Sequence, residues 1–248
     1  MLKALLMVFS CCCLYVQAQT LAPIRVVTEY SPPHQTLVQG EVSGLSTELV
    51  LAILAEAGVS ATIEMFPWAR AFNIARSQPN VLIYNMARTP EREEQFHWLG
   101  TVAAYQLGFV GLSHRQDITI TSLDEALAFT IAVQRDDLSA NFLLQQGFDL
   151  GVQLVLVADI SESWQLLRNG KVDLIIDDAV ALNDMVAKLD LPQSSVRFVY
   201  AIPQLKQQTW LAASLATSPE LINAIKFAHK KIALSPRYHQ IMSSSYRE

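Results

Sequence analysis

The sequence predicts an α/β protein built from two similar units, each a largely parallel sheet flanked by helices. Strand-like and helix-like segments alternate along most of the 248 residues, an order typical of parallel sheets with helices on both faces. The alternation starts near residue 24 and starts again near residue 129. The chain also exceeds the usual size of one domain. We therefore expect a sheet in each unit rather than one sheet continuing through both.

The first unit contains three strands and two helices. Ser46 is a candidate helix cap, apolar residues follow at helical spacing, and Gly58 ends the pattern. Another helical pattern follows Pro67. Strands are expected at 24–29, 61–66 and 80–86, with helices at 46–58 and 68–77.

The second unit repeats this order after a connecting segment at 105–113. Apolar runs of strand length again alternate with amphipathic segments that begin with Ser or Ala. Strands are expected at 129–134, 152–157, 172–177 and 196–202, and helices at 139–147, 161–170 and 179–189. An amphipathic helix is expected at 219–242.

The first 18 residues are predicted to be a secretory signal peptide. Lys3 precedes a short apolar run, and Val16-Gln17-Ala18 places small residues at the cleavage positions. The run is shorter than the ~20 residues of a membrane span; a lipoprotein signal, cleaved before a cysteine, is the alternative. Cleavage after Ala18 removes Lys3 and all cysteines (11–13), leaving 17 basic against 23 acidic residues and no thiol. We expect a periplasmic protein.

Composition argues against several classes of function. The net charge of -5 and the absence of a basic stripe speak against nucleic acid. The five histidines are scattered, so we predict neither a metal nor a cofactor. For His34 we expect an exposed position in its turn, with contact to a ligand in the nearby cleft as the alternative. No nucleophile elbow or phosphate-binding glycine loop follows a strand, so we expect no enzyme activity.

Polar and aromatic residues follow the predicted strands. In parallel α/β sheets, ligands bind beyond the carboxyl ends of the strands. The first unit places aromatics and arginine there, and the second places carboxylates. A guanidinium binds a carboxylate through two hydrogen bonds and an aspartate accepts from an ammonium group, so this cleft suits a small zwitterion. The residues concerned are Glu29, Tyr30, Trp68, Asn85, Arg88 and Arg92 in the first unit, and Asp137, Asp159, Asp177 and Asp178 in the second.

Four segments together resemble a known family: "GLSTELVLAILAEAG", "TPER", "NGKVDLIIDDAVA" and "PELINAIKFAHKKIALSPRYHQIM". Their order is similar to that of the periplasmic solute-binding proteins of family 3, the polar-amino-acid type, over essentially the whole mature chain. "PWARAF" and "ARTPERE" indicate a divergent subgroup. The resemblance implies the type II periplasmic-binding-protein fold, with lobe one at 19–108 and 202–248, lobe two at 109–201, and two strands crossing between them. It also implies hinge closure over a small ligand, a monomer, and an ABC permease as partner.

The resemblance assigns roles to four of these residues. Arg92 of "TPER" matches the arginine that holds the ligand carboxylate, and Asp178 matches the aspartate that takes the ammonium group. Tyr30 matches an aromatic that covers the ligand side chain, and Trp68 lies near a second one. Asp178 also suits a helix cap, which is compatible with ligand binding. For its neighbour Asp177 we expect a solvent-exposed or structural role.

Two further predicted ligand residues depart from the family pattern. Asn85 lies where Ser, Gly or Thr is usual. Asp137, followed by Leu138, stands where a Ser-Thr or Thr-Thr pair is common. Arg88 matches no ligand residue in the family, and Glu29 is a candidate structural partner for it.

Two other functions remain open at this point. The same binding fold could serve as a sensory module that presents solute to a membrane signalling protein. It could also be a dehydratase-like enzyme in which Glu29, Asp137 and Asp178 converge as acid and base.

Overall fold

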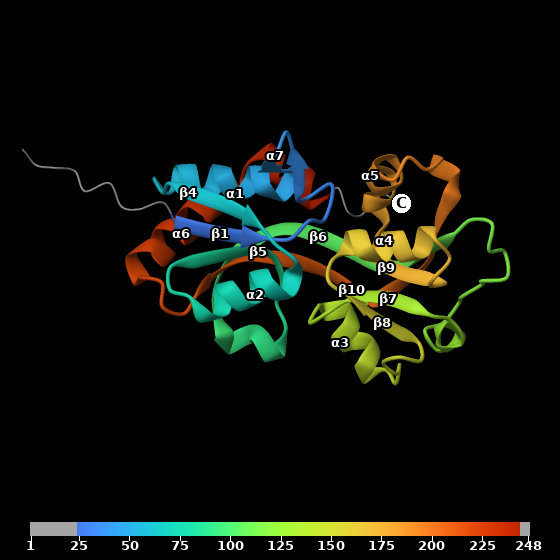
Figure 1. Ribbon diagram of the computed structural model, residues 1–248. Coiled ribbons are helices and arrows are strands. Elements are labelled where there is room, and N and C mark those ends of the chain that lie inside the picture. Colours follow the sequence, from blue (N-terminus) through green and yellow to red (C-terminus); the bar gives the residue numbers. More distant parts are fainter. Residues whose placement is uncertain (1–23, 244–248) are drawn as a thin grey trace, which may run out of the picture.

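The structure, a computed structural model, describes residues 24–243, so the signal peptide predicted at 1–18 lies outside the described residues. Two lobes lie side by side, each with helices packed against strands, and two long strands run between them (Figure 1). These long strands are β6 (Phe96–Leu112) and β10 (Val196–Ser214). The predicted α/β class is confirmed.

The first lobe contains the N-terminal elements and the C-terminal helices. Its strands are β1 (Ile24–Thr28), β4 (Ala61–Met65), β5 (Val81–Ala87) and a hairpin of β2 (Thr36–Val38) and β3 (Glu41–Ser43). Its helices are α1 (Leu45–Glu56), α2 (Trp68–Ser77), the 3-10 helix η1 (Pro90–Gln95), α6 (Pro219–Ile232) and α7 (Pro236–Met242).

The second lobe contains the middle of the chain. Its strands are β7 (Ile131–Gln134), β8 (Leu154–Val157) and β9 (Leu174–Asp178). Its helices are α3 (Leu138–Gln145), α4 (Ile160–Arg168) and α5 (Leu182–Lys188), with short 3-10 turns η2 (Asp124–Ala128), η3 (Ala179–Ala181) and η4 (Gln193–Ser195).

Hydrogen bonds join the strands of both lobes into one eight-stranded sheet, in the order β4-β1-β5-β10-β6-β9-β7-β8. The expectation of a separate sheet in each unit is therefore wrong. β6 and β10 are antiparallel partners over most of their length, so the crossing strands belong to the sheet instead of linking two sheets. Their register shifts between Ala201 and Lys206, where the chain passes from one lobe to the other.

Alternation along the strands explains how helices cover both faces of the sheet. In the first lobe, Val26 and Leu82 pack in a core with α1 and α6, whereas their neighbours Val27 and Ile83 pack in a second core with α2. Every residue of β5 is buried, as expected for a central strand covered on both sides. The second lobe has the same arrangement, with separate cores under α3 and under α4 and α5.

Several local details differ from the sequence prediction. The β2–β3 hairpin falls in a segment with no predicted element. Helix α1 begins after Gly44, so Ser46 lies inside the helix and does not cap it. The hydroxyl of Ser46 is hydrogen-bonded to Nδ1 of His34 (3.1 Å). His34 is fully buried rather than exposed, and its ring packs on Tyr105. The C-terminal helix is divided, and Ser235 caps its second part.

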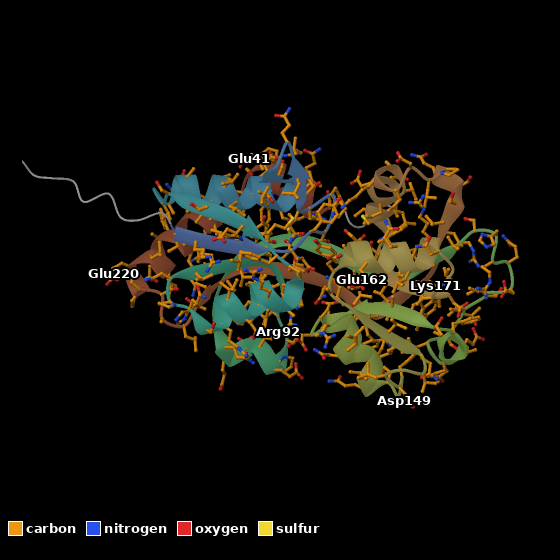
Figure 2. All side chains as sticks on the ribbon, viewed as in Figure 1. Glu41, Arg92, Asp149, Glu162, Lys171 and Glu220 are labelled. Atoms are coloured by element: carbon orange, nitrogen blue, oxygen red, sulfur yellow. The ribbon has the colours of Figure 1, made fainter. Side chains whose placement is uncertain are left out.

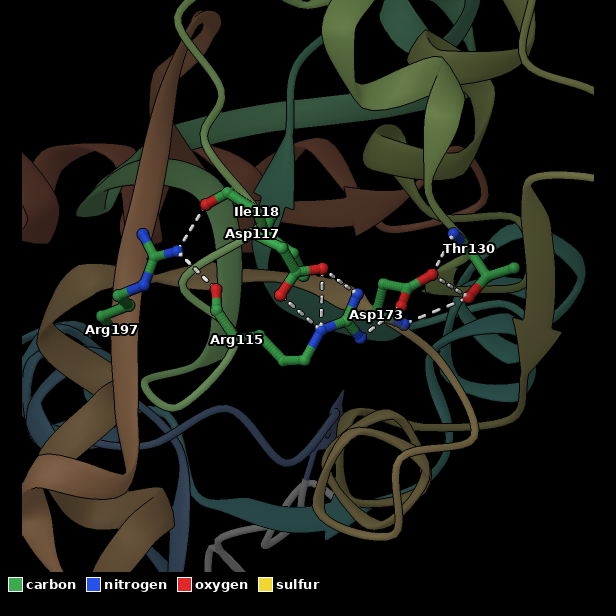
Figure 3. A network of polar contacts seen from close by, with 6 residues as sticks. All are labelled: Arg115, Asp117, Ile118, Thr130, Asp173 and Arg197. Carbon is green, nitrogen blue, oxygen red and sulfur yellow. Dashed lines mark hydrogen bonds and ion pairs between the residues drawn. The ribbon is translucent and has the colours of Figure 1, made fainter.

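A polar network holds the far end of the second lobe together (Figure 3). Arg115 pairs with Asp117 and with Asp173, and Asp173 also accepts hydrogen bonds from Thr130. Arg197 of β10 donates to the carbonyl oxygens of Arg115 and Ile118. The network therefore fixes the connection after β6 against the starts of β7, β9 and β10.

Gly108 occupies a point of close approach between the crossing strands. A Cβ there would lie 2.3 Å from the carbonyl oxygen of Tyr200, a backbone atom that cannot move aside alone. We expect Gly108→Ala to lower the free energy of unfolding by about 1–3 kcal/mol, the usual range for overpacking, as measured by denaturant unfolding. Gly111→Ala, on the same strand, would meet side-chain atoms no closer than 3.2 Å and is the control. Equal losses in both variants would contradict the steric explanation.

Candidate functional site

A cavity of about 70 Å³ lies between the two lobes. Both lobes and both crossing strands contribute to its wall, so it forms only where the lobes meet. The first lobe contributes Glu29, Ser31, Trp68, Asn85, Ala87 and Arg92; the second contributes Gln134, Asp137, Leu138, Ser139, Ile160, Ile176 and Asp177; β6 and β10 contribute Tyr105, Leu107, Gln207 and Thr209.

The structure brings together four of the six residues predicted to bind ligand. Trp68, Asn85, Arg92 and Asp137 all line the cavity. Tyr30 and Asp178 are not among its lining residues. The post-strand loops therefore converge as the parallel topology requires.

Arg92 enters the cavity from η1, where Pro90 occupies the first turn. Its side chain lies on the part of the first lobe that faces the second (Figure 2) and is only 6% exposed. It donates to the carbonyl oxygens of Ala87 and Asp136, both at 3.3 Å, and its guanidinium lies 5.3 Å from the ring centre of Trp68. Among the described residues it forms no ion pair, so its positive charge is held in place without being neutralised. Burial lowers the pKa of Arg92, but a guanidinium stays charged in a protein.

Arg88 has a different environment. It forms an ion pair with Glu93 and lies over the rings of Trp98 and Trp210, at 5.3 and 4.7 Å from their centres. The proposed partner Glu29 is therefore wrong for Arg88. The side chain is 36% exposed and does not line the cavity.

Three carboxyl groups line the cavity together with Arg92: Glu29 from the same lobe, and Asp137 and Asp177 from the other. Glu29 follows β1, and its Oε2 accepts from Nε2 of Gln134 in the other lobe (2.6 Å). Burial of its carboxyl group, together with the nearby charge of Asp137, raises the pKa of Glu29 to about 8. Asp137 caps α3 by accepting from the backbone N–H of Ser139.

Asp177, rather than Asp178, faces the cavity. Asp177 accepts from Nε1 of Trp164 (2.7 Å), and burial raises its pKa to about 7. Asp178 accepts from the backbone N–H groups of Val180 and Gln106, both at 3.0 Å, and so caps η3 and anchors β6. Both residues lie on β9, but the Asp178 carboxylate is occupied by these two backbone N–H groups and does not line the cavity. A solvent-exposed role for Asp177 is therefore wrong, while the predicted capping by Asp178 is present.

Direct contacts between the lobes surround the cavity. Trp68 donates through Nε1 to the carbonyl oxygen of Asp136 (3.1 Å). Tyr30 packs against the second lobe, and Nζ of Lys188 lies 3.5 Å from its ring centre. With the Glu29–Gln134 hydrogen bond, these contacts show that the lobes are closed on each other. Tyr30 thus contributes to closure in this structure and not to the cavity wall.

Three neutral polar side chains that line the cavity are hydrogen-bonded to one another: Asn85, Tyr105 and Thr209. Nδ2 of Asn85 donates to the Tyr105 hydroxyl (3.0 Å), and the Thr209 hydroxyl donates to Oδ1 of Asn85 (3.2 Å). Tyr105 donates onward to Gln35, and burial raises its pKa well above the usual value. Tyr105 and Thr209 lie on the crossing strands, outside the loops after parallel strands where ligand residues were expected, so neither was predicted.

The family comparison agrees with this fold. The profile of the bacterial extracellular solute-binding proteins, family 3, matches residues 24–245, and the chain belongs to that family. A sequence comparison with curated proteins finds no match.

Solved structures show the same fold. An ancestral arginine-binding protein bound to glutamine superposes with a TM-score of 0.77 at 21% identity, covering 91% of this chain and 98% of that one. A histidine kinase sensor domain similar to periplasmic binding proteins gives 0.76 at 16%, covering 90% and 96%. The substrate-binding protein of an amino acid ABC transporter gives 0.73 at 16%, covering 92% and 100%. The predicted type II periplasmic-binding-protein fold is confirmed.

Residues 24–243 contain neither a membrane-spanning helix nor a cluster of metal ligands. No helix in this range is long and apolar enough to cross a membrane. No group of three or more His, Cys, Asp or Glu side chains in this range is arranged to hold a metal ion.

Proposed function

We propose that the protein captures a small polar ligand, an amino acid or a related small carboxylate, in the cavity between its lobes. The observation that carries this proposal is the buried guanidinium of Arg92, which forms no ion pair within residues 24–243 and shares the cavity with the carboxyl groups of Glu29, Asp137 and Asp177. A guanidinium binds a carboxylate through two charge-assisted hydrogen bonds, and carboxylates accept from ammonium groups. The arrangement therefore suits a molecule that carries both groups.

Capture requires the lobes to open and close. We place the lobes at 19–108 with 202–248 and at 109–201, with the hinge in β6 and β10 near the register shift between Ala201 and Lys206. The ligand's two ends contact different lobes, so only the closed form satisfies both and ligand shifts the equilibrium towards it. We expect small-angle scattering to show a smaller radius of gyration at saturating ligand. Profiles that coincide with and without ligand would contradict closure.

A thermal-shift screen of amino acids, small carboxylates and amines tests the binding proposal. A ligand that binds only the native state stabilises it and so raises the melting temperature. At a free ligand concentration of a hundred times Kd, the stabilisation is about 2.7 kcal/mol. We expect at least one compound with both an amino and a carboxylate group to raise it, and Arg92→Ala to abolish that rise. If no compound with both groups raises it at millimolar concentration, the proposal is wrong.

The partner we propose is an ABC importer, with export to the periplasm through the N-terminal signal and action as a monomer. Family membership supports this reading. The likeness to a histidine kinase sensor domain supports the alternative of a membrane signalling partner. A pull-down with the ligand-bound protein distinguishes the two partners. We expect it to recover a permease and not a membrane kinase.

Binding without chemical change is the proposed activity. The raised pKa values of Glu29 and Asp177 in an enclosed cavity favour one alternative, acid–base chemistry on a bound acid. Mass spectrometry of the ligand after prolonged incubation distinguishes the two readings. We expect the ligand to be recovered unchanged.

A further inference from the structure

The sheet narrows to two strands where β6 and β10 pass between the lobes (Figure 1). β10 pairs with β5 of the first lobe from Thr209 onward, and β6 pairs with β9 of the second lobe from Leu107 onward. Within residues 24–243, the segments 104–106 and 206–208 pair only with each other, and we call them the hinge ribbon. Two-stranded ribbons twist more than wide sheets, so rotation of one lobe against the other concentrates here.

The second-lobe end of the hinge ribbon is irregular. Residues 202–205 of β10 have no ladder partner in β6 and lie opposite Leu107 alone. Ile202 and Leu205 are buried in the core of the second lobe, so this bulge is anchored there. Backbone groups in a bulge are left out of the ladder and need other hydrogen-bond partners.

The side chain of Gln106 supplies such a partner. Its Nε2 donates to the carbonyl oxygens of Ile202 (3.2 Å) and Leu107 (3.1 Å). Gln106 is the last residue of β6 before the bulge, because it pairs with Lys206 on the other side of the skipped residues. Its amide therefore joins the two crossing strands where their regular pairing is interrupted.

The backbone of Gln106 is held by β9. Its N–H donates to Oδ2 of Asp178 (3.0 Å), and Oδ1 of Asp178 accepts from the backbone N–H of Val180 (3.0 Å). The regular pairing of β6 with β9 ends at Leu107, so the Asp178 carboxylate extends the hold of the second lobe by one residue. Asp178 is buried, and hydrogen bonds to an ionised acceptor are about twice as strong as neutral ones.

We propose that Gln106 fixes the second-lobe end of the hinge, and that its hydrogen bonds to Ile202 and Asp178 limit how far the lobes rotate against each other. This inference rests on the proposed opening and closing and names the residue that controls it. Hinges absorb motion at a few residues. When these hydrogen bonds are lost, β6 and β10 separate more easily at the bulge, and the lobes sample a wider range of orientations.

Distances between the lobes in the ligand-free protein test this role. The predicted mature chain, residues 19–248, contains no cysteine, so introduced cysteines are the only sites for spin labels. Asn73→Cys on α2 and Asp149→Cys at the lower edge of the second lobe (Figure 2) place one label on each lobe, both at exposed positions. Double electron–electron resonance at pH 7.5, above the pKa of about 6 to which burial raises the Asp178 carboxyl, measures the distance distribution.

Gln106→Glu keeps the shape of the side chain but turns its donor into an acceptor. The new carboxylate would face the carbonyl oxygens of Ile202 and Leu107 without a proton to share, so we expect a distance distribution about twofold wider than that of the parent protein. Gln106→Ala only removes the donor and should widen it less. Gln208→Glu adds the same charge to the same ribbon at an exposed side chain that forms no hydrogen bond within residues 24–243, and should leave the width unchanged.

A second pair of variants tests the part of Asp178. Asp178→Asn replaces one of its two acceptor oxygens by an amide donor, and it should also widen the distribution. Asp159→Asn weakens the same kind of helix cap at the start of α4, away from the hinge ribbon, and should leave the width unchanged. Circular dichroism confirms that each variant is folded, and Gln106→Ala carries the test if Gln106→Glu does not fold.

The outcomes separate this inference from the proposed function. A Gln106→Glu distribution as narrow as that of the parent protein, or equal widening in Gln208→Glu, overturns the role given to Gln106. An unchanged width in Asp178→Asn overturns the part given to Asp178. Scattering with saturating ligand tests closure separately, so the role of Gln106 can fail while closure stands. If Gln106→Glu widens the distribution but ligand leaves the scattering profile unchanged, the hinge assignment stands and the proposed closure is wrong.

Discussion

Arg92→Ala is expected to weaken ligand binding at least about a hundredfold. Removing one partner of a desolvated charge pair typically costs roughly 2–5 kcal/mol, and a hundredfold change corresponds to about 2.7 kcal/mol at ~1.4 kcal/mol per decade. Arg92 is buried, lines the cavity and has no carboxylate partner among the described residues. Its charge is therefore free to act on a ligand. Calorimetry with a ligand from the screen measures the loss.

Arg88→Ala is the matched control, because it removes the same side chain four residues away. Arg88 is paired with Glu93 and packed on Trp98 and Trp210, outside the cavity. We expect its affinity to stay within about threefold of the parent protein, with some loss of stability from the lost ring contacts. If Arg88→Ala loses binding and Arg92→Ala keeps it, the wrong arginine has been assigned.

The ligand-free protein is expected to lose stability as pH rises from about 6.5 to 8. The folded-state pKa of Glu29 is about 8 against an ordinary value of 4.5, and that of Asp177 is about 7 against 3.8. In this range the folded state holds protons that the unfolded state has released, so the free energy of unfolding falls with pH. Each such proton contributes at most ~1.4 kcal/mol per pH unit, and the midpoint of thermal unfolding should fall by several degrees.

His34 offsets only part of the effect below that range. Burial lowers its pKa from 6.5 to about 4, so its contribution to stability has the opposite sign and rises with pH between those values. Below pH 6.5 the two effects oppose each other, and above it only the carboxyl groups act. Glu29→Gln should therefore raise the melting temperature near pH 8 and flatten its dependence on pH. An unchanged slope in this variant would contradict the assignment to Glu29.

The sequence predicted most of the first lobe because each signal there is local. The helix predicted at 68–77 matches α2, which begins after Pro67 and covers one face of β5. Arg92 and Trp68 were found because parallel strands place their following loops at one edge of the sheet. The continuous sheet was not predicted because its continuity depends on pairing between β6 and β10, about a hundred residues apart.

The missed residues share a physical reason. Asp177 lines the cavity and Asp178 does not, because the Asp178 carboxylate accepts from the backbone N–H of Gln106 on β6, a long-range contact that the local strand pattern does not reveal. His34 lies in a turn-like sequence, and only its long-range packing on Tyr105 buries it. Glu29 was recognised as a post-strand residue, but its place in the cavity depends on Gln134 from the other lobe.

The most direct test of the central claim is a crystal structure of the protein with the ligand that the screen identifies. We expect the ligand between the lobes, with its carboxylate within 3.2 Å or so of the Arg92 guanidinium, the usual limit for such hydrogen bonds, and with an amino group on Glu29, Asp137 or Asp177. A ligand bound outside this cavity, or bound inside it without contact to Arg92, would contradict the account.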